Sequence, residues 1–294
     1  DIGNFMPDLK KNLDPLKLSG LISVKTNLTG PAANFKEIMA HSNASCDEAQ
    51  IAGLKFTNLN AEAILEEGKV KKLNLQSNLY DGTLNILSSA DLNRPNTPFE
   101  TAIKMEAVNL AKLKNDTPAK DEDLRGSIAF TSLVNGSLKE PLQIKGSGNL
   151  NISEGYLMKK EFVSIFMIAE LNNLIFTDAS ANFTIGDQKI NTENFVLKSE
   201  GANLNGSGWV GFDHKIQFVL NPEFNTELIS QSNSLKKGPS SFIASAAGKY
   251  LTIKIDGTLE KPIVKTIKNP TELIKRTGEI ITENVGQLLQ GIFQ

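Results

Sequence analysis

The chain has 294 residues, of which 40% are hydrophobic and 22% are charged, and its formal net charge is −2. This length allows one large domain or two smaller ones, and the near-neutral charge argues against a nucleic-acid-binding protein. A single cysteine, Cys46, excludes an internal disulfide framework and a multi-cysteine metal site. Apolar runs fall short of the ~18 residues of a membrane-spanning helix, and no signal-peptide pattern is present, so we expect a fragment or a processed chain.

Short runs with an apolar residue at every second position recur along most of the chain. This period places the apolar side chains on one face of a strand and the polar ones on the other, which predicts antiparallel strands with one wet face. Turn or bulge signals such as Tyr80-Asp81-Gly82, Ser153-Glu154-Gly155 and Asp256-Gly257 separate these runs. The alternating sets are Ile128 and Phe130, Leu142 and Ile144, Leu150 and Ile152, Phe183 and Ile185, Phe195 and Leu197, Val210 and Phe212, Ile216, Phe218 and Leu220, and Leu251, Ile253 and Ile255.

Three segments break the strand pattern. Residues 158–173 have apolar side chains at helical spacing, which predicts a short mid-chain helix. Residues 224–248 are rich in Ser, Asn and Lys and are predicted to form a long loop. Residues 270–294 are predicted to form an amphipathic helix, with Asn269 as N-cap and Pro270 at the first helical position. Trp209 has the opposite parity from Phe212, so it should face away from that side chain.

An internal repeat accompanies the alternation. Gly20, Ile22 and Val24 recur as Gly126, Ile128 and Phe130, and residues 54–65 recur as 174–185. A second, shorter repeat relates residues 136–142 to residues 257–263, each with a glycine, a leucine, two charges and a proline. The first repeat predicts two copies of a β unit stacked side by side in an elongated array. The second predicts a strand that ends at the glycine and a new one that begins after the proline.

The order of several motifs resembles the C-terminal region of the AsmA family of bacterial envelope proteins, a TamB-related group of repeating β-groove proteins. These motifs are the Gly-x-Leu-x-x-Pro segments at Gly136 and Gly257, the glycine-rich strand opening at residues 146–155, the apolar segment 162–171, and the strands at residues 175–188, 195–199 and 206–210. The resemblance is good over residues 124–294 and weaker over the first hundred.

The resemblance implies a mostly β fold: an elongated, curved antiparallel sheet forming a groove or an open sandwich, with a short mid-chain helix and a C-terminal helix. It implies an upstream β-groove unit at residues 1–118 and an AsmA-like unit at residues 119–294 that ends in the helix 270–294. The implied function is non-enzymatic: a lipid conduit or scaffold that shields acyl chains and supports outer-membrane lipid transport or assembly. The implied location is the periplasm, anchored to the inner membrane through an N-terminal segment absent from this sequence.

The implied partners are phospholipid or another acyl lipid, both membranes, with the outer membrane met through the C-terminal end, and an envelope protein; nucleic acid is not expected. A lipid-binding face would cover its apolar side chains with hydrocarbon. The predicted lipid-binding residues are Phe130, Leu150, Ile152, Phe183, Ile185, Phe195, Leu197, Phe212 and Phe218.

Catalytic chemistry, a metal site and a cofactor are not predicted. His41 and Cys46 are close in sequence, but no oxyanion feature accompanies them, and a metal site would need two further ligands. Two alternatives stay open. The first alternative to the lipid conduit is a structural β-repeat module with a solid core that binds a protein partner by edge-strand contact. The second is an enzyme with a pocket near His41 or His214.

Overall fold

The structure is a computed structural model that describes residues 17–31, 35–117, 120, 123–158, 176–199, 202–224, 251–259 and 261–268. The predicted helices at 158–173 and 270–294 and the predicted loop at 224–248 lie outside these residues, apart from Met158 and Phe224, each of which ends a strand.

The described residues form one antiparallel sheet of fifteen strands. From β3 onward each strand pairs with the next one in the sequence, while β1 and β2 both pair with β3. The strands are β1 (Ser19–Gly20), β2 (Ser23–Thr29), β3 (Met39–Ile51), β4 (Leu54–Glu66), β5 (Lys69–Leu79), β6 (Gly82–Asp91), β7 (Pro98–Asn109), β8 (Asp123–Ser137), β9 (Lys145–Met158), β10 (Phe176–Gly186), β11 (Lys189–Ser199), β12 (Ala202–Gly211), β13 (Ile216–Phe224), β14 (Leu251–Gly257) and β15 (Pro262–Lys268).

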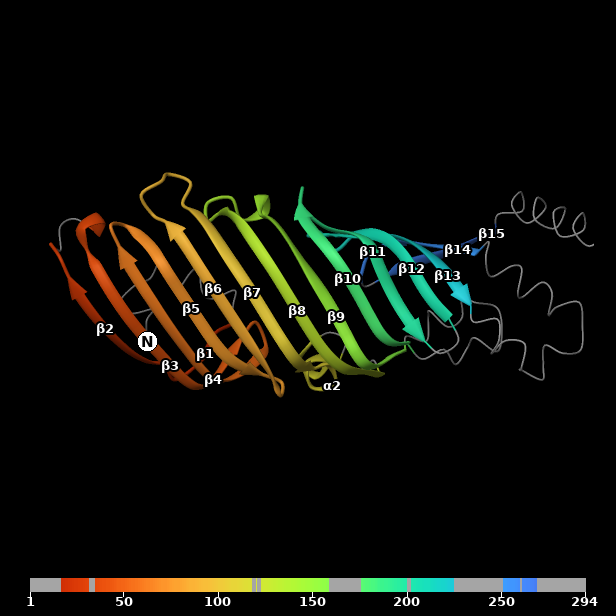
Figure 1. Ribbon diagram of the computed structural model, residues 1–294, viewed down its shortest axis with the longest axis horizontal. Coiled ribbons are helices and arrows are strands. Elements are labelled where there is room, and N and C mark those ends of the chain that lie inside the picture. The colour runs from red at the N-terminus through yellow and green to blue at the C-terminus, as the bar shows by residue number, and fades with distance from the viewer. Residues whose placement is uncertain are drawn as a thin grey trace, which may run out of the picture.

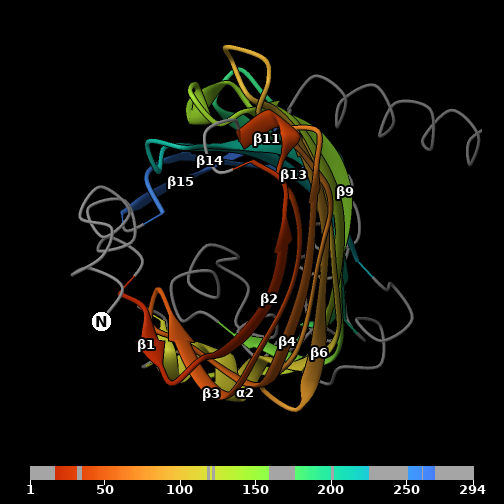
Figure 2. The same ribbon diagram turned by 90° about the vertical axis from the view of Figure 1, so that its left-hand side faces the viewer.

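The sheet is elongated and curved. Figure 1 shows the strands side by side along the length of the molecule. Figure 2, viewed from one end, shows the sheet curled into a C that is open along one side. The predicted fold class, a mostly β protein built on an elongated, curved antiparallel sheet, is therefore confirmed.

Helical segments are few in the described part of the chain. They are the 3-10 turns η3 (Phe35–Glu37), η4 (Lys114–Asp116) and η5 (Pro141–Gln143) and the α-helix α2 (Leu110–Leu113). The side chain of Asn109 caps α2 by accepting a hydrogen bond from the backbone N–H of Lys112.

The alternating pattern of the sequence reappears as alternating burial. In β7, Thr101, Ile103 and Met105 are partly buried, while the residues between them are exposed. One predicted strand is wrong: Leu142 lies in the 3-10 turn η5, and Ile144 caps it. Pro141 stands at the first position of that turn, where its fixed φ suits a helical turn better than a strand.

The backbone agrees with the internal repeat. Gly20 and Gly126 occupy equivalent positions and have φ angles of +135° and +128°, in the region open chiefly to glycine. The turn after β4 at Glu67 and the turn after β10 at Asp187 both have φ of 51°. The shorter repeat marks the β8–β9 and β14–β15 connections.

The sheet continues across the predicted boundary between residues 1–118 and 119–294. Strands β7 and β8 lie on either side of this boundary and pair from Pro98–Ser137 to Asn109–Ser127. The two predicted units therefore share one uninterrupted hydrogen-bonded sheet.

Candidate functional site

Eight of the nine predicted site residues lie on one face of the sheet. Residues paired directly across two strands project to the same face, so the register identifies that face. Phe130 of β8 pairs with Leu150 of β9. Ala179 of β10 pairs with Ile152 on one side and with Leu197 on the other, so these two residues share its face. The remaining members follow by the period of two along β10, β11 and β13: Phe183, Ile185, Phe195 and Phe218.

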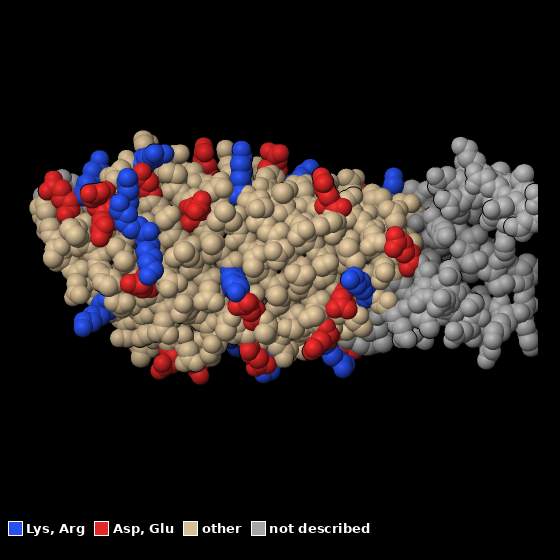
Figure 3. All heavy atoms as spheres, viewed as in Figure 1, with Lys and Arg blue, Asp and Glu red and all other residues tan. Residues whose placement is uncertain are grey.

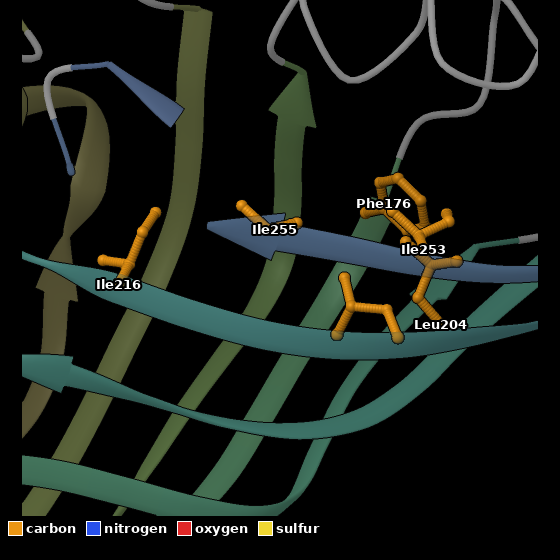
Figure 4. Close-up of a cluster of buried hydrophobic side chains, with 6 residues drawn as sticks. Phe176, Leu204, Ile216, Ile253 and Ile255 are labelled. Atoms are coloured by element: carbon orange, nitrogen blue, oxygen red, sulfur yellow. The ribbon is translucent and has the colours of Figure 1, made fainter. Parts of the chain in front are cut away.

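This face is the concave one. A buried cluster combines Phe176 from β10 with Leu204 from β12 and Ile253 from β14. Figure 4 shows these three side chains gathered together, with Ile255 and Ile216 farther along β14 and β13. Strands β10 and β14 are separated by three other strands, so their side chains meet only because the sheet curls toward this face. Phe195, Leu197 and Phe218 pack against the same cluster.

A second buried cluster lies on the same face nearer the N-terminus. Its members include Leu79, Leu84, Val108 and Ile128, and Leu110 of α2 packs onto them. Leu150 and Ile152 of the predicted set contact this cluster. The concave face is thus mostly apolar from β3 to β14, and its buried Ser77 and Ser132 side chains donate hydrogen bonds to backbone carbonyl groups.

The apolar part of the concave face, called the wall from here on, is only partly covered by described elements. Leu204 is 1% exposed and Ile253 is 2% exposed, but the predicted residues Phe130, Phe183 and Phe195 are only partly buried. Other partly buried members of this wall were not among the predicted residues: Leu75, Ile86, Ile103 and Met105. Their own period-two spacing in β5, β6 and β7 carried the same signal.

Phe212 is the exception. It lies in the turn between β12 and β13, where its backbone N–H donates to the carbonyl oxygen of Gln188 at 2.9 Å. Trp209 projects to the convex face, as its parity predicted; its Nε1 donates to Oε1 of Gln217, and the Lys189 ammonium lies 4.1 Å from its ring centroid.

The convex face is mostly polar and uncharged. A row across neighbouring strands places amide or hydroxyl side chains beside one another, including Asn60, Gln76 and Asn85 and, farther on, the directly paired Asn149 and Asn182. Figure 3, which shows this face, has a mostly uncharged surface, with charged side chains gathered toward the left-hand end and the edges and a few oppositely charged neighbours between. A shallow hollow around Ala102 is flanked by Leu87 and Leu133, the main apolar interruption.

The candidate thiolate–imidazole pair is not assembled. His41 and Cys46 lie on the same regular stretch of β3 at opposite parity, so they project to opposite faces. His41 is 3.1 Å from Glu62, whose pKa is held below its usual value by hydrogen bonds from Lys72 and His41. The Cys46 thiol is buried and donates to the carbonyl of Glu48. No group of three or more potential metal ligands occurs among the described residues.

A polar network ties the end of the groove together beside α2. The Tyr80 hydroxyl donates to Asp116 at 2.7 Å and accepts from the backbone N–H of Lys55 at 3.0 Å. Burial, the largest cause, and the neighbouring Asp116 carboxylate raise the pKa of Tyr80 to about 12. Lys112 on α2 donates to Asp81 at 2.6 Å. These bonds hold α2 and η4 against the strand ends.

Comparisons with protein-family models, with curated proteins and with solved structures each found no match to this chain. Within the described ranges, the helices are too short to cross a bilayer. The apolar concave face is therefore the feature of the described residues that bears on function.

Proposed function

We propose that this chain is a non-enzymatic β-groove protein that shields lipid acyl chains on its concave face. The observation that carries the proposal is an apolar wall, running across most of an open sheet, of which many side chains stay partly exposed. Each methylene group of an acyl chain that becomes fully buried in such a groove contributes about 0.8 kcal/mol. Lipid would thus supply the cover that the described elements leave incomplete.

The biological setting is proposed on the sequence motifs alone. Their resemblance to the AsmA family supports an envelope protein of the periplasm, anchored to the inner membrane in the full-length protein, with phospholipid or another acyl lipid as partner. Support of outer-membrane lipid transport or assembly follows from the same resemblance.

The alternative is a structural module that binds an envelope protein by strand addition. The edge strand β2 favours it, because Val24 is 59% exposed and Leu28 is 62% exposed. Both edges nevertheless carry residues that discourage pairing with a further strand: Lys25 in β2, and Pro262 and Lys265 in β15. Lipid on the concave face is the better supported of the two.

Lipid analysis after purification without detergent tests the proposal. We expect mass spectrometry to find phospholipid or another acyl lipid bound to the chain, and we expect the chain to accelerate transfer of a fluorescent phospholipid between vesicles. A lipid-free chain without transfer activity would refute the proposal and leave the strand-addition module.

Adjacent residues of β6 offer a matched pair of variants. Ile86 is on the concave wall, and Leu87 is 53% exposed on the convex face. Ile86→Gln should reduce the bound lipid severalfold, because a buried amide next to hydrocarbon lacks a hydrogen-bond partner. Leu87→Gln should leave the bound lipid unchanged. Equal effects of the two changes would contradict lipid binding on the concave face.

A further inference from the structure

At two places on the concave face, a phenylalanine lies across a glycine and meets a second phenylalanine two strands away. At the first, Phe183 of β10 is paired with Gly148 of β9 and reaches diagonally to Phe130 of β8. The two ring centroids are 5.6 Å apart, and the ring planes differ by 14°. We call this group of three residues the first platform.

The second platform repeats the arrangement three strands later. Phe218 of β13 is paired with Gly208 of β12 and reaches diagonally to Phe195 of β11. These ring centroids are 5.9 Å apart, and the planes are tilted by 58°. The same diagonal offset across a glycine occurs in both platforms, although the residues lie on different strands.

The glycines let the rings lie down on the sheet. A Cβ atom added at Gly148 would be 2.5 Å from Cζ of Phe183, and one added at Gly208 would be 2.5 Å from Cδ1 of Phe218. Such distances leave no room for a side chain, so each ring occupies the space above bare backbone. The rings of Phe183 and Phe218 therefore lie close to the backbone, and all four rings of the platforms stay partly exposed.

We propose that the two platforms are the preferred seats of the acyl chains, so that lipid is bound at two discrete places rather than evenly along the wall. This inference rests on the proposed function. The site chemistry favours hydrocarbon over a peptide, because a peptide brings N–H and C=O groups that need partners. Beside the first platform, Ser132 already donates to the carbonyl of Ser147, and the second platform packs within an apolar cluster.

The distance between the two platforms suits a single acyl chain that lies along the groove. Three strand spacings separate β9 from β12, which is about 14 Å along the sheet. An acyl chain that crosses the strands meets the first platform and then the second, with aliphatic side chains between them.

Affinity measurements on ring-deleting variants test the inference. The ligand is phosphatidylcholine with dibrominated acyl chains, presented in vesicles. Phe183→Leu and Phe218→Leu should each weaken binding about fivefold to tenfold, because leucine keeps the site apolar but removes ring contacts. The matched control is Phe99→Leu, since Phe99 projects to the same face near the start of β7 and belongs to neither platform. That change should alter binding less than about twofold.

Quenching of tryptophan fluorescence by the bromine atoms gives a second readout. Trp209, the single tryptophan of the chain, lies on the convex face, so its emission should survive lipid binding. In a Trp209→Phe background, Phe183→Trp and Phe218→Trp should report strong quenching. Ile86→Trp, on the wall away from both platforms, should report weaker quenching.

The outcomes separate the inference from the function on which it rests. If the unaltered chain binds no lipid, the proposed function fails. If it binds lipid, but both leucine variants bind as tightly as the unaltered chain and the three tryptophan positions are quenched equally, the platforms are refuted while the groove stands. Selective weakening at the platforms, with normal unfolding midpoints of the variants, supports them.

Discussion

The two halves of the sheet bury the same concave face in different ways. In β10–β15 the sheet curls until it covers itself, and Leu204, Leu220 and Ile253 are 1–2% exposed. In β3–β9, α2 packs onto one end of the face, where Val108 is 0% exposed, while residues such as Ile86 and Ile103 elsewhere on the face remain partly exposed. Identical period-two alternation thus yields a buried core next to a partly exposed wall in each half. Curvature closes the core in β10–β15, where Phe195 and Phe218 stay partly exposed, and α2 closes it in β3–β9.

The largest expected effect tests the buried core of β10–β15. Leu204→Ala should lower the free energy of unfolding by about 3 kcal/mol, because it removes a fully buried side chain where the curled sheet has little freedom to collapse. Urea denaturation followed by circular dichroism measures this. The matched control is Leu87→Ala on the convex face, which should cost less than about 0.5 kcal/mol. Equal costs would mean that Leu204 contributes no more than an exposed side chain of the convex face, and the buried core of β10–β15 would be refuted.

A glycine substitution tests how closely the strands and side chains approach each other in that half. A Cβ atom at Gly206 would meet the backbone carbonyl of Val219 and lie 2.7 Å from Cδ2 of Leu220. Gly206→Ala should therefore cost about 1–3 kcal/mol through overpacking. Gly186, at the end of β10, has no atom within 4 Å of the corresponding position. Gly186→Ala should be close to neutral, and a comparable loss at both positions would contradict the overpacking explanation.

Much of the wall could be predicted because its cause is local. Alternation at residues such as Leu150 and Phe183 places side chains on one face whatever the strands do at longer range. The same alternation predicts Phe212 on this face, but the strand ends at Gly211, and Phe212 and Asp213 lie in a turn. Proline had a comparable effect at Leu142, which it directs into a 3-10 turn.

The curl that closes the core of β10–β15 could not be predicted from local alternation. It brings Phe176 to Ile253, which are far apart in the sequence and share no motif. Its origin lies in the accumulated twist of many strands and in bulges such as the register shift between Ser180 and Thr184. The platforms were missed for the same reason. A Phe–Gly–Phe diagonal exists only once the register of three strands is known.

The hydrogen bonds beside α2 should contribute moderately to the stability of β3–β9. Tyr80→Phe removes the hydrogen bond to Asp116 and the acceptor for the Lys55 backbone N–H, which should cost about 1 kcal/mol. The folded-state pKa of Tyr80 is raised from 10.0 to about 12. The stability linked to this group is therefore complete below pH 10 and is lost as the pH rises toward about 12.

The measurement is the free energy of unfolding of the unaltered chain and of the Tyr80→Phe variant between pH 9 and 11. Other tyrosines and lysines contribute equally to both proteins. The difference in stability between the unaltered chain and the Tyr80→Phe variant should shrink as the pH rises through this range. A difference that stays constant would show that the hydroxyl titrates as it does in the unfolded chain, and the network beside α2 would then contribute little.

The smallest expected effect concerns the convex face, where both halves of the sheet are alike. Trp209→Phe removes the hydrogen bond to Gln217 and weakens the contact with Lys189, both at a partly exposed position. The free energy of unfolding should change by less than about 0.5 kcal/mol. In the unaltered chain, aqueous acrylamide should quench the indole readily, because it lies outside the groove. A cost above about 1.5 kcal/mol, or an indole shielded from acrylamide, would place Trp209 in a core. The convex side would then be a second packed surface, and the apolar alternation would no longer single out the concave face as the one that needs a cover.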